Sequence, residues 1–199
     1  KKQGFDTICP PKKEKWYVKA PAFSFSKLRG LDAYLSPEMK STGEAIGYDR
    51  KMTRALYKAL QASGMQVVNY GTVFVTIADK DKDEALPLIR RFYNMGFNIE
   101  ATAGTAQFLK GHGIKTRIRK KISEGSEEIL NSIRQGYVNY VINTRAYDSP
   151  SASGAESDGQ QIRRCAVENG VTVFTALDTV KALLDVLQEM TMEISTIDM

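Results

Sequence analysis

The fold is decided at residues 72–78, where the sequence reads Thr72-Val73-Phe74-Val75-Thr76-Ile77-Ala78. This nearly continuous apolar run, rich in β-branched residues, predicts a strand that is buried on both faces. A helical pattern follows over residues 81–95, with Leu88, Ile89 and Phe92 on one face and Gly96 after its end. A buried strand that leads directly into a helix is the repeating unit of a parallel sheet.

The same alternation of strand and helix continues along the chain. Strands are predicted over residues 97–101, 116–121, 137–144 and 171–175, and helices over residues 104–110, 126–135 and 158–169. A last helix is predicted from Thr175 or Asp178 to about Met190. Single strands separated by single helices imply right-handed crossovers and a parallel sheet covered on both faces. We therefore expect an α/β domain with a doubly wound, five-stranded parallel sheet over residues 66–199.

Residues 1–65 have a different pattern, which predicts a short α+β segment before that domain. Residues 16–25 have the composition of a strand, and Pro21 favours an edge or a bulge. Asp49 is expected to cap a helix whose apolar residues recur at helical spacing until Gly64. The chain opens at Lys1 without a methionine, so we expect a fragment of a longer protein.

Composition and charge exclude several classes of protein. Hydrophobic residues make up 42% and charged residues 26% of the chain, as in a folded domain. No apolar run reaches the roughly 18 residues of a membrane span, and the start lacks the pattern of a signal peptide. One histidine and two cysteines far apart in the sequence argue against a zinc site or a disulfide framework. This cysteine usage predicts a cytoplasmic protein. The net charge of +5 permits an anionic ligand without indicating nucleic acid.

Polar side chains gather where the predicted strands end. Open parallel sheets bind their ligands outside the carboxyl ends of the strands. Threonine hydroxyls and the amides of a helix N-terminus donate hydrogen bonds, and glycine lets a ligand approach the backbone closely. This pattern predicts a phosphate site, whereas the alternative is that the threonines only cap a helix and the lysines are solvated. The residues expected at the site are Lys82, Thr102, Gly104, Thr105, Lys121, Asn143 and Arg145.

Several stretches of the sequence carry a family resemblance, namely residues 97–106, 121–125, 140–144 and 162–166, with residues 37–44 upstream. They resemble the carboxyl-terminal regulatory domain of the large subunit of carbamoyl-phosphate synthetase. The resemblance implies a methylglyoxal-synthase-like fold for residues 66–199. It also implies that residues 1–65 are the end of the carbamoyl-phosphate-forming ATP-grasp domain, followed by a linker helix.

The resemblance implies an allosteric role in an enzyme that makes carbamoyl phosphate for pyrimidine and arginine synthesis. The family's last domain binds a nucleotide effector such as UMP or IMP. By position, the family's phosphate site falls on Lys82, Thr102, Thr105, Lys121 and Asn143, and Arg145 stands where the family has a threonine. The residues that bind ATP and Mg or Mn would precede Lys1. The chain itself is therefore expected to catalyse nothing and to need no cofactor.

The partners implied by the resemblance are the nucleotide, the glutaminase small subunit, the rest of the large subunit and further copies of the chain. Neither nucleic acid nor a membrane is expected. One alternative is a methylglyoxal-synthase-type lyase that eliminates phosphate, although Ser123-Glu124-Gly125 stands where that chemistry needs an aspartate. The other alternative is an oligomerisation module that binds no ligand.

Some members of the family also bind ornithine at the junction of the two parts of the chain. They hold it with carboxylates, a tyrosine and a threonine. The corresponding residues here are Ala20 for a glutamate, Val173 for the tyrosine, with Phe174 beside it, and Thr175 for the threonine. Burying an ammonium group without a carboxylate costs several kcal/mol. We therefore expect nucleotides and not ornithine to act through this chain.

Overall fold

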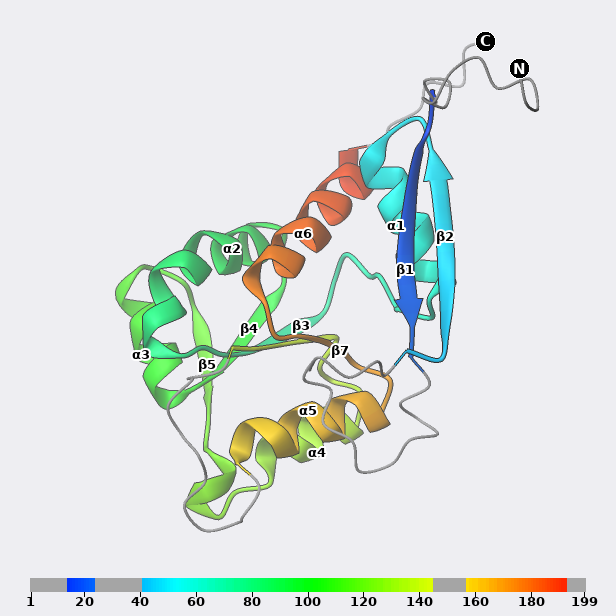
Figure 1. The fold of residues 1–199 in the computed structure, drawn as a ribbon. Helices are drawn as coiled ribbons and strands as arrows, with labels where there is room; N and C mark the ends of the chain where they lie inside the picture. Colours follow the sequence, from blue (N-terminus) through cyan, green and yellow to red (C-terminus); the bar gives the residue numbers. More distant parts are fainter. Residues whose placement is uncertain (1–13, 24–40, 145–156, 193–199) are drawn as a thin grey trace, which may run out of the picture.

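The computed structural model describes residues 14–23, 41–144 and 157–192 (Figure 1). An antiparallel pair of strands, β1 (Trp16–Ala22) and β2 (Gly43–Asp49), forms the first sheet. The second sheet is entirely parallel and has the strand order β5-β4-β3-β6-β7. Its strands are β3 (Thr72–Thr76), β4 (Asn98–Thr102), β5 (Thr116–Arg119), β6 (Tyr140–Asn143) and β7 (Thr172–Phe174). The expected five-stranded parallel sheet is confirmed.

Helices cover both faces of the parallel sheet. Figure 1 shows α2 (Lys82–Asn94), α3 (Ala103–Gly111) and α6 (Leu177–Met192) on one face, and α4 (Glu128–Arg134) and α5 (Asp158–Glu168) on the other. The chain runs outward from β3 to β5 and then returns past β3 to β6. Because crossovers are right-handed, this reversal moves the helices to the opposite face. The switch point of the sheet therefore lies between β3 and β6.

The central strand β3 contributes to two separate cores. Val73 and Val75 are completely buried in the core beneath α2, α3 and α6, whereas Phe74 is buried in the core beneath α4 and α5. This alternation is what a strand covered on both faces requires. A shift of one residue in the register of β3 would exchange the two sets of side chains.

Tyr140 connects this core to the segment that precedes β3. Its hydroxyl accepts a hydrogen bond from the Val68 N–H at 2.7 Å and donates one to the Val68 carbonyl at 2.8 Å. Burial raises the pKa of Tyr140 to about 12. The phenol therefore keeps its proton, and both bonds, at neutral pH.

The helix α1 (Met52–Ala62) packs against the β1–β2 hairpin through small residues. A Cβ on Gly47 of β2 would lie 2.1 Å from the carbonyl oxygen of Ala55 and 2.4 Å from the backbone nitrogen of Ala59. Both alanines are completely buried. The absence of a side chain at Gly47 therefore allows the backbones of strand and helix to approach each other directly. The strand β2 itself lies outside the strands predicted from the sequence.

The start of α1 differs from the prediction that Asp49 caps it. The helix begins at Met52 with Lys51 as its N-cap residue. Asp49 instead accepts hydrogen bonds from the Lys58 ammonium at 2.7 Å and from the Lys51 N–H at 3.1 Å. These bonds lower the pKa of Asp49 to about 2. Asp49 therefore holds the residues that lead into α1, and it does not cap the first turn of the helix.

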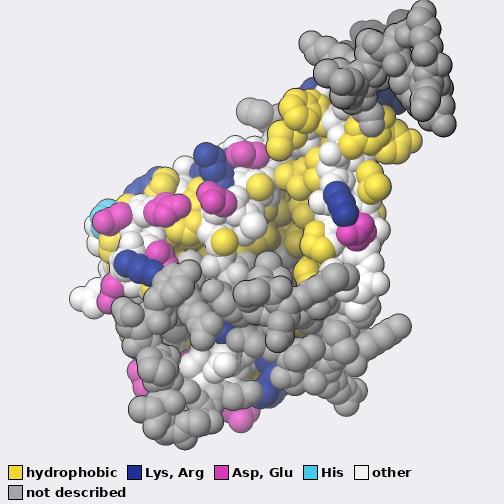
Figure 2. All heavy atoms as spheres, viewed as in Figure 1, with side chains coloured by type: hydrophobic (Ala, Val, Ile, Leu, Met, Phe, Trp, Pro, Cys, Tyr) yellow, Lys and Arg dark blue, Asp and Glu magenta, His cyan; other side chains and the backbone are white. Residues whose placement is uncertain are grey.

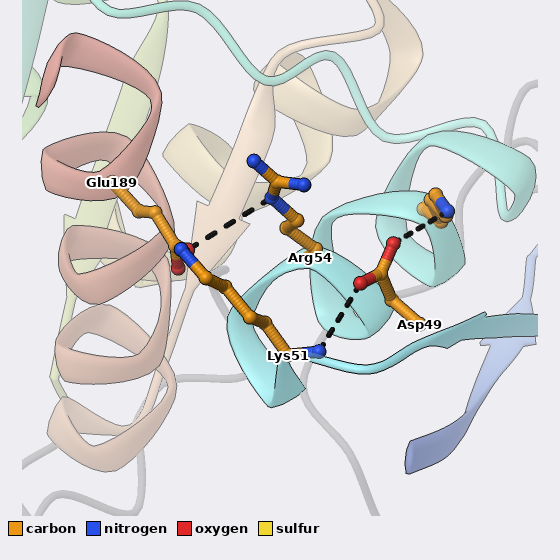
Figure 3. A network of polar contacts seen from close by, with 5 residues as sticks. Asp49, Lys51, Arg54 and Glu189 are labelled. Carbon is orange, nitrogen blue, oxygen red and sulfur yellow. Dashed lines mark hydrogen bonds and ion pairs between the residues drawn. The ribbon is translucent and has the colours of Figure 1, made fainter. Parts of the chain in front are cut away.

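The helix α6 joins the two parts of the structure. Arg91 of α2 donates a hydrogen bond of 2.6 Å to Asp185 of α6. Further along α6, Glu189 lies 3.1 Å from the Lys51 ammonium and 4.0 Å from Arg54 (Figure 3). At 16 residues α6 is also the longest described helix, and none of the described helices is both long and apolar enough to cross a membrane.

Gly47→Ala is expected to lower the free energy of unfolding by at least about 2 kcal/mol, because its methyl group would overlap backbone atoms that cannot rotate away. Gly43→Ala in the same strand is the matched control, since its Cβ would lie 3.9 Å from the Ala22 Cβ, an ordinary contact. Urea unfolding followed by circular dichroism measures both variants. Equal stability of Gly47→Ala and the wild type would contradict the close packing of β2 on α1.

Candidate functional site

The candidate site lies at the carboxyl edge of the parallel sheet, at its switch point. The register pairs Thr76 of β3 with Asn143, the last residue of β6. On the other side of β3, Val75 pairs with Ala101, so Thr102 ends β4 at the same edge. The carboxyl ends of parallel strands on either side of a switch point form the crevice in which open α/β sheets bind ligands.

The N-terminus of α3 also lies at this edge, because the helix begins directly after β4. Thr102 is the N-cap residue, yet its side chain makes no capping hydrogen bond. Thr105 accepts a hydrogen bond from the Ile77 N–H at 3.3 Å, which ties α3 to the end of β3 and leaves its hydroxyl hydrogen able to donate. Gly104 is exposed, and a Cβ there would have no atom within 4 Å. The first turn of α3 is thus open to a ligand from outside.

Two lysines supply positive charge near this edge, and both charges act on the carboxylate of Asp79. The ammonium of Lys82, the first residue of α2, lies 2.6 Å from the Asp79 carboxylate and 5.7 Å from the centre of the Phe108 ring on α3. The hydrogen bond and charge of Lys82, followed by the charge of Lys121, hold the pKa of Asp79 below its usual value. Asp79 is therefore the ion-pair partner of Lys82, and the charge of Lys121 acts on the same carboxylate.

The end of β6 is held in place from both sides. The Thr144 hydroxyl accepts a hydrogen bond from the Ala78 N–H at 2.9 Å, which fixes it against the end of β3. The Asn143 side chain accepts one from the guanidinium of Arg163, which lies on α5 and is only 2% exposed. Asn143 itself is 5% exposed. Its carboxamide is therefore largely buried at the edge of the sheet.

Six of the seven residues predicted for the site come from segments that meet at this one edge. Arg145 lies outside the described residues. The prediction omitted Asp79 and Arg163, which contact the predicted Lys82 and Asn143. The assembled groups are hydroxyls, amides and ammonium groups, which suit an anion with several acceptor oxygens. Within the described residues, no group of three or more His, Cys, Asp and Glu side chains is arranged to hold a metal ion. The six residues are Lys82, Thr102, Gly104, Thr105, Lys121 and Asn143.

A separate cavity of about 540 Å³ lies between the hairpin with α1 and the β7–α6 segment. Figure 2 shows hydrophobic side chains gathered between α6 and the hairpin. Ala20, Val173, Phe174 and Thr175, the positions compared with an ornithine site, all line this cavity. None of the described residues that line it carries a charge. The cavity therefore offers no described ion-pair partner for an ammonium group.

Two comparisons relate the chain to known proteins. A family model described as the MGS-like domain matches residues 84–175, from the first turn of α2 to just after β7, and identifies an MGS-like domain in the chain. The chain is also similar to the crystal structure of methylglyoxal synthase from Elizabethkingia anophelis NUHP1. That similarity has a TM-score of 0.48 at 19% sequence identity, and it covers 59% of this chain and 79% of that chain.

Asp79→Asn is expected to strengthen the binding of inorganic phosphate by up to about fivefold, because it removes a carboxylate that competes for the Lys82 ammonium. Calorimetric titration of the full chain measures the change. Asp83→Asn makes the same change in net charge within the first turn of α2 and is the control. Weaker phosphate binding by Asp79→Asn than by Asp83→Asn would contradict the role of Asp79 as a competing counter-ion.

Proposed function

We propose that this chain is an allosteric regulatory domain that binds a nucleotide effector such as UMP or IMP through its phosphate. In this proposal it belongs to the large subunit of a glutamine-hydrolysing carbamoyl-phosphate synthase. It would control carbamoyl phosphate synthesis for pyrimidine and arginine biosynthesis, together with a glutaminase small subunit. ATP and its Mg or Mn ion would act elsewhere in that enzyme, and the chain itself would catalyse nothing.

The observation that carries the proposal is the set of donors at the switch point. The N-cap residue Thr102 leaves the first amides of α3 without a side-chain cap, and Lys82 pairs with the exposed Asp79, on whose carboxylate the charge of Lys121 also acts. A phosphate offers acceptor oxygens to the amides and hydroxyls and negative charge to the ammonium groups. The match to the MGS-like domain over residues 84–175 supports the proposal, because it includes most of these residues.

The connection through α6 supports a regulatory role for such a site. The strand β7 belongs to the same sheet as the site, and α6 follows it directly. The Glu189 carboxylate of α6 then contacts Lys51 and lies near Arg54, at the start of α1. A ligand that changed the position of α6 would therefore act on the hairpin segment, which we propose to be the end of the ATP-grasp domain.

Titration of the full chain with UMP and with IMP tests the proposal. Charge-assisted hydrogen bonds each contribute roughly 1.5–3 kcal/mol, so Lys82→Ala should weaken the bound nucleotide about ten- to a hundredfold. Absence of binding for both nucleotides would contradict the proposal and leave the oligomerisation module as the alternative. Phosphate release from dihydroxyacetone phosphate by the same sample would favour the lyase alternative.

Gly104→Ala is expected to make the chain more stable while weakening UMP about tenfold or more. Alanine stabilises a helix by roughly 0.5–1 kcal/mol relative to glycine, and no atom lies within 4 Å of the added methyl group. The same methyl group would occupy the surface on which the phosphate is proposed to lie. Thermal unfolding and calorimetry measure the two effects.

Gly111→Ala at the other end of α3 is the matched control, since its Cβ would also have no atom within 4 Å. It should leave UMP binding unchanged. If Gly104→Ala binds UMP as tightly as Gly111→Ala, the phosphate does not lie on the first turn of α3.

Ornithine is expected neither to bind the chain nor to change its unfolding temperature. Its ammonium group would enter a cavity whose described lining residues carry no charge, at a cost of several kcal/mol. Differential scanning calorimetry at millimolar ornithine, with UMP as the positive control, measures this. Stabilisation by ornithine that Thr175→Ala abolishes would overturn the expectation.

A further inference from the structure

The Asn143 carboxamide has a defined orientation in the structure. A carboxamide carries an acceptor oxygen on one side and a donor NH₂ group on the other. A guanidinium only donates hydrogen bonds, so the atom of Asn143 that faces Arg163 must be the oxygen. The NH₂ group must therefore point away from Arg163.

That NH₂ group has no hydrogen-bond partner among the described residues, although Asn143 is only 5% exposed. A buried donor without an acceptor costs roughly 1–3 kcal/mol. Ser132 is the one described residue with a fully buried side-chain polar atom that lacks a partner, so the Asn143 NH₂ group retains some contact with solvent. It is a donor that a ligand at the carboxyl edge can satisfy.

Gly159, in the first turn of α5, leaves the space that the Asn143–Arg163 pair needs. A Cβ on Gly159 would lie 3.1 Å from an Arg163 guanidinium nitrogen and 3.2 Å from the Asn143 oxygen. Both distances are shorter than ordinary carbon contacts, and both side chains are buried. A glycine in the first turn of α5 thus keeps this pair undistorted.

We propose that Arg163 is a positioning residue of the anion site, which holds the Asn143 carboxamide so that its NH₂ group faces the ligand. The proposal rests on the anion site described under the proposed function. It adds an explanation of which ligand groups that site accepts. With the NH₂ group fixed outward, the site accepts a group that offers only acceptor oxygens, as a phosphoryl group does. A ligand group that itself donates a hydrogen bond at this point is disfavoured.

The test measures UMP and inorganic phosphate binding to full-chain variants by calorimetry. Arg163→Gln replaces a pure donor by a group that both donates and accepts, so the Asn143 carboxamide is no longer held in one orientation. It is expected to weaken UMP about five- to tenfold. Arg163→Lys keeps a pure donor and should bind UMP within about threefold of the wild type.

A double-mutant cycle identifies how Arg163 acts. If it acts through Asn143, then adding Arg163→Gln to Asn143→Ala should cause no further loss of UMP binding. Asn143→Asp gives Arg163 a carboxylate partner, so the chain should stay folded while UMP binding falls about a hundredfold or more. If Arg163→Gln fails to fold, the cycle is carried out with Arg163→Lys, and a loss of UMP binding by Arg163→Lys that persists in full on Asn143→Ala would overturn the inference.

The outcomes separate this inference from the proposed function. Absence of UMP and phosphate binding by the wild type would refute the anion site, and the inference with it. UMP binding by the wild type with equal binding by Arg163→Gln would refute only the positioning role. An equal loss from Arg163→Gln with and without Asn143→Ala would mean that Arg163 acts by its own charge, which also overturns the inference.

Discussion

The structure depends on the double burial of β3. Successive residues of this strand enter two different cores, with Val73 and Val75 on one side and Phe74 on the other. Because each core accepts only its own set, the strand cannot shift along its neighbours without exposing apolar side chains. The fixed register in turn brings Thr76 and Asn143 together at the switch point. The geometry of the candidate site is therefore a consequence of hydrophobic packing further down the same strands.

The parallel sheet could be predicted because its pattern is local. Each of its strands is a short apolar run followed by a helix, and single helices between single strands imply right-handed crossovers and a parallel sheet. The strand β2 could not be predicted in this way. It contains Gly43 and Gly47, residues that normally disfavour strands, and Gly47 is explained only by the approach of α1. The start of α1 differs for a similar reason, since Asp49 bonds to Lys58 instead of capping the helix.

The site was predicted as a set of strand ends, and the topology brings the described members of that set to one edge. That prediction needed only parallel strands, whose carboxyl ends share one edge. The strand order, and with it the switch point between β3 and β6, comes from the structure. Arg163 was not predicted, because an arginine beside Arg164 on a helix resembles a solvated face. Its burial depends on how α5 packs over the end of β6. Asp79 was missed because its importance comes from charges that are near it in space, and Lys121 is distant from it in sequence.

The helix α6 is held by two kinds of contact, apolar packing on the sheet and ion pairs to α1, and dissolved salt affects them differently. The cores on either side of the parallel sheet are apolar, and dissolved salt screens no interaction within them. The contacts of Glu189 with Lys51 and Arg54 are partly exposed ion pairs, which weaken as the Debye length falls from about 10 Å at 0.1 M salt to about 3 Å at 1 M. Rising salt is therefore expected to weaken the polar part of the link between α6 and the hairpin segment, while the packing of the parallel sheet stays unchanged.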